Sequence, residues 1–215
     1  MRKITTLKAA LLLGAAVAAG TTASARTPLD FFCLEGADVA FPELPATTRM
    51  DMTDYFNSSM ARPSTNAYDG EAIIDSADSA TLTVRPATAT TVQLSVLPGA
   101  DTVLCVIETL ALPQPDSRIS FYTTDWAPLR KAPLDAPVLA DWLTDEGRRQ
   151  RAEVEAWLPF LIASATYDPE TATLVITNEM QKYFAGDDDL QQLQEWLRPS
   201  LTYKWNGRRF DNVAQ

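Results

Sequence analysis

Apolar and polar residues alternate along residues 72–126 of the chain, a pattern typical of strands in an antiparallel sheet. The alternation is clearest in residues 80–85, 91–97 and 117–124. Residues 102–111 are apolar on both faces, which predicts a central strand covered from two sides. We therefore expect this region to form a meander of antiparallel strands.

The pattern changes to a helical period after residue 144. Residues 145–158 are charged, and Val154, Trp157 and Leu158 form the expected buried stripe of one helix. Residues 161–177 then contain two alternating segments separated by Asp-Pro-Glu, which predicts a hairpin.

The last part of the chain predicts a helix over residues 188–197 and a strand over residues 201–205. The pair Asn206-Gly207 predicts a two-residue type I′ turn, because both positions of that turn need positive φ. Residues 208–213 would be the returning strand. It would bring Phe210 into the apolar layer formed by Leu201, Tyr203 and Trp205 of the strand before the turn.

Earlier in the chain, Met52, Tyr55 and Phe56 lie at helical spacing and predict a short amphipathic helix over residues 49–60. Three prolines in residues 127–138 indicate an extended segment that crosses between two halves of the molecule. The fold class is therefore α+β, with a mostly antiparallel sheet (the meander plus the C-terminal hairpins) packed with a few helices.

The N-terminus has the three parts of a secretory signal peptide. Arg2, Lys3 and Lys8 are its positive region, residues 9–20 are its apolar run, and Ala-Ser-Ala ending at Ala25 is its cleavage site. The apolar run is too short to span a bilayer of ~30 Å. We expect cleavage near Ala25, no transmembrane anchor, and a periplasmic or secreted protein.

Residues 1–25 would then be the signal peptide and residues 26–215 a single exported domain of unknown function. An alternative division of that domain has two lobes, residues 49–126 and 142–215, joined by the proline-rich crossing segment.

Charge and composition exclude several classes of protein. The chain has 18 Lys and Arg, 28 Asp and Glu and no His, for a net charge of −10. Such an acidic chain does not bind nucleic acid through a basic face. Without His, neither catalytic triads nor the usual zinc sites can form. We expect no cofactor and no metal site.

Cys33 and Cys105 leave two alternatives open. In an oxidising compartment they form a disulfide that closes a loop of about 70 residues. Otherwise they are separate small core residues, which suits Cys105 because it lies within an apolar run.

Two acidic features are candidates for chemistry. Asp187, Asp188 and Asp189 lack the ligand spacing of a calcium loop and are interpreted as the acidic first turn of a helix. Glu108 lies in the apolar strand, where a carboxylate with a raised pKa would be a catalytic candidate. The interpretation we favour places Glu108 on a polar face or at an edge, so no catalytic residue is assigned.

Residues 116–126 are rich in aromatic and hydroxyl side chains. As a functional feature, exposed Tyr122 and Trp126 would stack on a glycan or anchor a partner protein. As a structural feature, the same residues would complete the core beneath a half-buried strand, and this interpretation is favoured.

Four segments carry a resemblance to a known family: RMDMTDYFNSSM (49–60), LPGADTVLCVIETL (97–110), PDSRISFYTTDWAPL (115–129) and LRPSLTYKWNGRRF (197–210). Through them the chain resembles a domain-of-unknown-function family of small exported proteins from Bacteroidales. The resemblance implies an exported location and this architecture, and it implies no catalytic residue.

The leading functional hypothesis is a non-catalytic protein of the cell envelope that binds a protein or glycan partner through its sheet. The alternative is a carboxylate-based envelope hydrolase acting on glycans, which requires two acidic side chains about 5–10 Å apart in one cleft.

Overall fold

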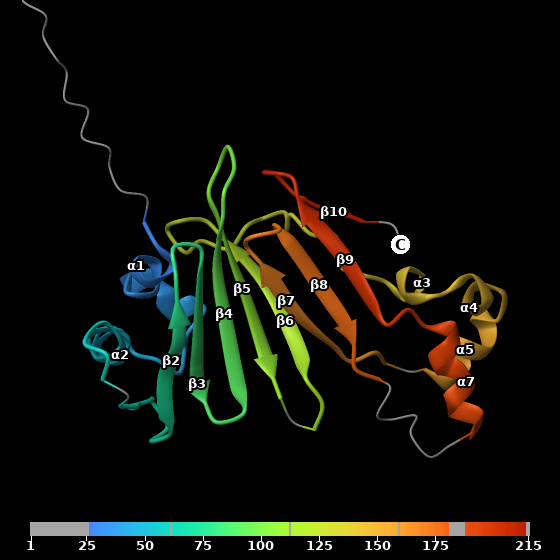
Figure 1. Cartoon of the computed structure of the whole chain (residues 1–215), viewed down its shortest axis with the longest axis horizontal. Helices are drawn as coiled ribbons and strands as arrows, with labels where there is room; N and C mark the ends of the chain where they lie inside the picture. Colours follow the sequence, from blue (N-terminus) through green and yellow to red (C-terminus); the bar gives the residue numbers. More distant parts are fainter. Residues whose placement is uncertain (1–25, 61, 112, 159, 181–187, 214–215) are drawn as a thin grey trace, which may run out of the picture.

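Two antiparallel sheets form the body of the protein, one with six strands and one with four (Figure 1). This computed structural model describes residues 26–60, 62–111, 113–158, 160–180 and 188–213. The predicted α+β class with mostly antiparallel pairing is confirmed. The predicted signal peptide lies outside the described residues.

The six-stranded sheet is a meander in which each strand pairs with the next one along the chain. Its strands are β1 (Ser64–Thr65), β2 (Glu71–Ala77), β3 (Thr81–Ala87), β4 (Thr90–Leu97), β5 (Val103–Leu110) and β6 (Asp116–Tyr122). The predicted central strand is β5, whose residues from Val103 to Ile107 are all buried because both faces of the sheet are covered.

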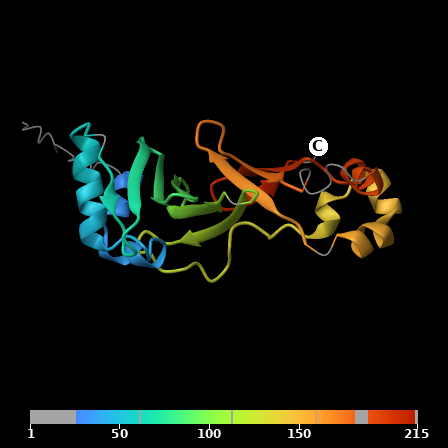
Figure 2. The same ribbon diagram turned by 90° about the horizontal axis from the view of Figure 1, so that it is seen from below.

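The N-terminal segment covers one face of this sheet with α1 (Pro28–Phe32), the 3-10 helix η1 (Glu35–Val39) and α2 (Ala46–Asn57). Figure 2 shows α1 and α2 packed beside the sheet at one end of an elongated molecule. The predicted helix over 49–60 forms, but α2 begins three residues earlier, directly after Pro45. Met52 is buried as expected, and so is Arg49, which the pattern had not indicated.

The four-stranded sheet has the order β10-β9-β8-β7. Its strands are β7 (Ala163–Asp168), β8 (Thr173–Asn178), β9 (Ser200–Trp205) and β10 (Phe210–Asn212). The hairpin predicted over residues 161–177 is confirmed by the pairing of β7 with β8.

The remaining helices gather at the end of the molecule opposite α1 and α2 (Figure 1): α3 (Leu139–Trp142), α4 (Asp145–Arg149), α5 (Arg151–Trp157) and α7 (Asp188–Trp196). The single helix predicted over 145–158 is wrong, because Gln150 leaves helical geometry and separates α4 from α5. Val154 and Leu158 are buried as expected, whereas Trp157 is 57% exposed and is not part of the buried stripe of α5.

The C-terminal hairpin belongs to the second sheet. Phe210 is buried in the same core cluster as Leu201, Tyr203 and Trp205, as predicted. The two-residue type I′ turn is wrong: Phe210 pairs with Trp205, so four residues connect the strands, and only Gly207 has a positive φ, at +90°.

Two hydrophobic clusters lie on opposite faces of the six-stranded sheet. One lies under the N-terminal helices and includes Leu82, Leu94 and Leu104. The other joins the two sheets, because Cys105 and Phe121 of the first share it with residues of the second. Among the described residues, no helix has both the length and the apolar run needed to cross a bilayer.

Candidate functional site

The two sheets meet through side chains of β4 and β6 that bind the outer edge of β7. Ser117 Oγ accepts a hydrogen bond from the Ala165 N–H at 2.9 Å, and the Asp116 carboxylate accepts one from the Ala163 N–H at 3.4 Å. An edge strand normally exposes such groups to solvent or to another chain. Here the first sheet covers the edge of the second.

A groove of about 640 Å³ opens beside this junction, between β6, β7 and the proline-rich crossing segment. Its walls are formed mainly by apolar side chains from parts of the chain that are far apart in sequence: Ile119, Phe121, Leu134, Pro137, Leu139, Trp142, Leu158, Phe160, Leu161, Ala163, Ala165 and Ile176. The volume lies in the range typical of small-ligand sites.

The polar residues of the groove are already engaged. Asp116 and Ser117 bind β7, and Ser117 Oγ also lies 2.7 Å from Thr109 Oγ1. Phe160 lines the groove yet is 54% exposed, which places a large apolar side chain at its rim. Exposed apolar surface next to a concave apolar wall is typical of binding sites.

The outer backbone edge of β6 adds hydrogen-bonding groups to this apolar wall. The Leu129 N–H binds the Phe121 carbonyl on the side away from β5. Antiparallel pairing alternates, so the N–H and C=O of Ile119 point to that same outer side. No partner within the described part of the chain binds them. The groove therefore combines apolar pockets with an open strand edge.

The carboxylate pair that the hydrolase hypothesis requires is not found in the groove. Asp116 is the one acidic residue among the described residues that line it. Glu108 lies outside the groove lining and forms an ion pair with Arg118 across β5 and β6, as expected for the polar position that we favoured. Asp187 is outside the described residues, and Asp188 and Asp189 begin α7.

Tyr122 and Trp126 are both buried, and they do not form an exposed aromatic surface. Trp126 packs 5.5 Å from Tyr122 between ring centroids, and its Nε1 donates to the Phe31 carbonyl oxygen at 3.0 Å. The N-terminal segment covers this face of the sheet, which the alternation within β6 could not indicate. Their burial agrees with the structural interpretation of residues 116–126.

Cys33 and Cys105 are free thiols, so the disulfide alternative does not hold. The six-stranded sheet separates them: Cys105 faces the second sheet, and Cys33 ends α1 on the other side, 3.2 Å from Thr53 Oγ1. Burial raises the pKa of the Cys105 thiol, which keeps it protonated and unreactive.

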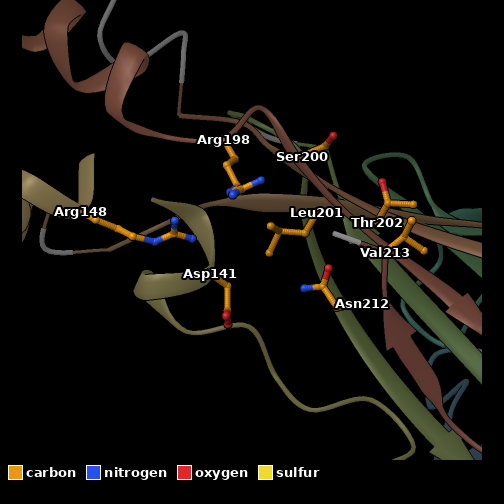
Figure 3. Close-up of a pocket in the computed structure, with 8 residues that line it drawn as sticks. All are labelled: Asp141, Arg148, Arg198, Ser200, Leu201, Thr202, Asn212 and Val213. Atoms are coloured by element: carbon orange, nitrogen blue, oxygen red, sulfur yellow. The ribbon is translucent and has the colours of Figure 1, made fainter. Parts of the chain in front are cut away.

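A second, smaller cavity of about 190 Å³ lies between α3, α4 and β9 (Figure 3). Its lining is more polar than that of the groove and includes Arg148, Arg198 and Asp141. The helix α3 separates the two sites, since Leu139 and Trp142 line the groove while Asp141 lines the cavity.

The sequence had not indicated either site. The sequence of the proline-rich segment predicts only a connection, although its apolar residue Leu134 is a sign that the segment packs against another part of the chain. The two arginines lie far apart along the chain and carry no motif that would join them.

These features define a two-sheet α+β protein with an apolar groove where the sheets meet. The chain belongs to a family described as proteins of unknown function, DUF3256, whose model matches residues 32–210. A solved structure of a domain of an uncharacterized protein from Porphyromonas gingivalis W83 has the same fold, with a TM-score of 0.70 at 22% identity. That match covers 86% of this chain and 96% of that chain.

The resemblance to a Bacteroidales family of unknown function is thereby confirmed. The comparison with curated proteins finds no match. Neither finding assigns an activity to the chain.

Proposed function

We propose that this protein is an exported, non-catalytic binding protein whose groove takes an extended apolar peptide segment of a partner protein. The observation that carries the proposal is the open backbone edge of β6 at Ile119, set in a groove of about 640 Å³ with largely apolar walls. A strand added to a sheet edge gains affinity from main-chain hydrogen bonds and specificity from pockets for alternate side chains.

The chemistry of the groove favours a peptide over the other occupants. A glycan needs several polar partners, and the polar side chains of the groove, Asp116 and Ser117, already bind β7. An acyl chain would cover the apolar walls but leave the N–H and C=O of Ile119 without partners, which costs free energy in a dry site. A peptide satisfies both requirements.

Export rests on the N-terminal sequence. The positive region, the short apolar run and the small residues ending at Ala25 support removal of the first 25 residues and work in the periplasm or outside the cell. N-terminal sequencing of protein recovered from the envelope or the medium tests this. Arg26 as the first residue is expected, and an intact Met1 would contradict export by this route.

The binding proposal is tested with a fluorescent apolar probe, N-phenylnaphthylamine, which becomes bright in apolar sites. Wild-type protein should bind it, and Ala163→Trp should abolish binding because the indole fills the groove. The matched control is Thr166→Trp, on the same strand but exposed, which should bind the probe like the wild type.

Competition then identifies the occupant. An acetylated, amidated peptide of alternating Val and Thr should displace the probe, and the same peptide with methylated backbone nitrogens should not, because it cannot donate to β6. If palmitate displaces the probe and neither peptide does, the groove takes acyl chains and the peptide proposal is overturned. Equal displacement by both peptides would overturn strand addition.

A further inference from the structure

The chain itself begins to add a strand to the outer edge of β6. Pro128 of the crossing segment forms an antiparallel bridge with Tyr122, and the Leu129 N–H donates to the Phe121 carbonyl at 3.0 Å. After Leu129, no further bridge or backbone hydrogen bond joins the described residues of this segment to β6. A peptide strand that continued in the same direction would next meet Ile119.

The open part of this edge is short. The backbone groups of Ser117, Ile119 and Phe121 point to the outer side of β6, because antiparallel pairing with β5 alternates. Leu129 occupies the position at Phe121, and β7 lies against the edge at Ser117, whose Oγ accepts the Ala165 N–H. Ile119 alone therefore offers a peptide one N–H and one C=O. Two main-chain hydrogen bonds contribute only modestly to binding, so a side chain of the peptide has to supply most of the affinity.

That side chain would point into the groove. Two residues directly opposite each other in an antiparallel pair place their side chains on the same face of the sheet. Ile119 lines the groove and packs against the cluster that joins the two sheets. The neighbouring residues of the peptide would point to the other face, where the Arg118 side chain is 74% exposed. One side chain thus enters the groove, and the two beside it face solvent.

Alanines leave room for a large side chain in the groove. Ala132 and Ala136 line it from the crossing segment, and Ala163 and Ala165 line it from β7. A longer side chain at any of these positions would occupy part of the space. An aromatic side chain buries about 150–250 Å² and gains the most from such a space. The walls therefore favour an aromatic side chain over a small one.

We propose that the groove selects its peptide by one aromatic side chain, carried by the residue that pairs with Ile119 and flanked by polar residues. This inference rests on the proposed function and adds the direction, the register and the recognised residue. A charged side chain at the central position is excluded. The groove's polar side chains, Asp116 and Ser117, already bind β7, and an unpaired charge in an apolar site is costly.

The test measures displacement of N-phenylnaphthylamine by acetylated, amidated peptides of sequence Thr-Ser-Xaa-Ser-Thr. Phe at the central position should bind at least about tenfold tighter than Val, and Lys should not displace the probe. Equal affinities across the series would overturn this inference and leave the proposed function standing. So would displacement by the alternating Val and Thr peptide but by none of this series. Displacement by no peptide at all would overturn both.

A single methyl group tests the register. The central residue donates its N–H to the Ile119 carbonyl, whereas the N–H of the next residue points away from β6. Methylation of the central nitrogen of the Phe peptide should weaken binding at least about tenfold. Methylation of the nitrogen that follows it should leave the affinity within about twofold of the parent peptide. Equal weakening by the two methyl groups would overturn the proposed register.

Variants of the alanine walls test the size selection. Ala132→Leu, at an exposed position, and Ala163→Leu, on the opposite wall, both reduce the space and should make Val bind better than Phe. The matched control is Ala140→Leu, which is exposed on α3 and does not line the groove, and it should keep the preference for Phe. Reversal of the preference in either wall variant supports the inference. Retention of the preference for Phe in both, or its reversal in Ala140→Leu as well, would overturn it.

Discussion

The side-chain amide of Gln93 pairs with both backbone groups of Tyr167. Its Nε2 donates to the Tyr167 carbonyl oxygen at 2.8 Å, and its Oε1 accepts from the Tyr167 N–H at 2.9 Å. A glutamine amide offers the same donor and acceptor as a peptide unit, so Gln93 replaces a neighbouring strand for β7. This contact, with those of Asp116 and Ser117, joins two sheets that share no backbone ladder.

Gln93→Leu should destabilise the protein by about 2 kcal/mol, because the N–H and C=O of the buried Tyr167 then lack partners. The free energy of unfolding, measured by urea titration, checks this. Gln93→Glu should also destabilise, since its carboxylate can accept from the N–H but repels the carbonyl oxygen. The matched control is Gln191→Ala on the exposed side of α7, which should change stability by less than about 0.5 kcal/mol.

Arg49 should be the most sensitive charged residue in the N-terminal half. It is fully buried, and it donates to the backbone carbonyls of Phe32, Leu34 and Leu44 as well as to the Asp38 carboxylate. These bonds hold the segment from α1 to α2 against the sheet. Arg49→Leu should destabilise by at least about 3 kcal/mol, because it leaves buried carbonyls without donors.

Variants of Asp38 show how much of the stability comes from the Arg49–Asp38 ion pair and how much from the carbonyl contacts of Arg49. The Asp38 side chain is 62% exposed, so Asp38→Asn should cost less than about 1 kcal/mol in urea unfolding. Arg49→Lys should not restore stability, because one ammonium group cannot reach three carbonyls that lie around a planar guanidinium. Equal losses from Asp38→Asn and Arg49→Leu would mean that the ion pair, and not the carbonyl contacts, stabilises this segment.

Local periodicity was sufficient to predict most of the fold. The apolar run that became β5 is buried on both faces, and the alternation in β3 and β4 determined which residues face the core. Arg49 shows the limit of this reasoning. A charged residue on a short amphipathic helix is normally assigned to solvent, and only the folded chain brings the carbonyls of three separate residues to it.

The candidate sites could not be predicted for the same physical reason. The groove is built from residues such as Ile119, Leu134 and Leu161, which lie on different segments, and each is ordinary in its own segment. Trp126 was considered as a binding residue because alternation within one strand says nothing about the N-terminal segment that covers it.

Gly207 should be the most sensitive backbone position of the C-terminal hairpin. Its φ of +90° is strained for any residue with a Cβ, so Gly207→Val should destabilise by about 1–3 kcal/mol. Gly99 approaches it closely, and a Cβ there would lie 2.1 Å from the Gly207 carbonyl oxygen. Gly99→Ala should therefore displace the same hairpin from the β4–β5 turn.

The control for this hairpin is Arg208→Val, which places the same β-branched side chain at the next, exposed position and should change stability little. Thermal melting checks these predictions: Gly207→Val and Gly99→Ala should lower the melting temperature, and Arg208→Val should leave it nearly unchanged. Deletion of residues 200–215 should lower the melting temperature more than either glycine substitution, because it removes β9 and exposes the edge of β8. An unchanged melting temperature after that deletion would mean that the hairpin is not an integral part of the sheet.

Tyr167 should make the protein sensitive to alkaline pH. Burial raises the pKa of its hydroxyl from 10.0 to about 12, with smaller contributions from Cys105 and Asp168. Between these values the unfolded chain has lost a proton that the folded protein still holds, so stability falls as pH rises. The contribution of Tyr167 is therefore fully present below pH 10 and is lost as pH approaches 12. One pKa unit corresponds to about 1.4 kcal/mol, so the full shift of two units corresponds to about 3 kcal/mol, of which about 2 kcal/mol is lost by pH 11.5.

Urea unfolding at pH 8 and at pH 11.5 measures this loss. Tyr167→Phe removes the titrating group and should reduce the difference in stability between the two pH values. Part of the difference should remain, because burial also raises the pKa of Tyr203 and of Cys105. The control is Tyr68→Phe, at a tyrosine that is 76% exposed, and it should leave the difference as it is in the wild type. If Tyr167→Phe and Tyr68→Phe behave alike, the alkaline transition does not come from the tyrosine that joins the two sheets.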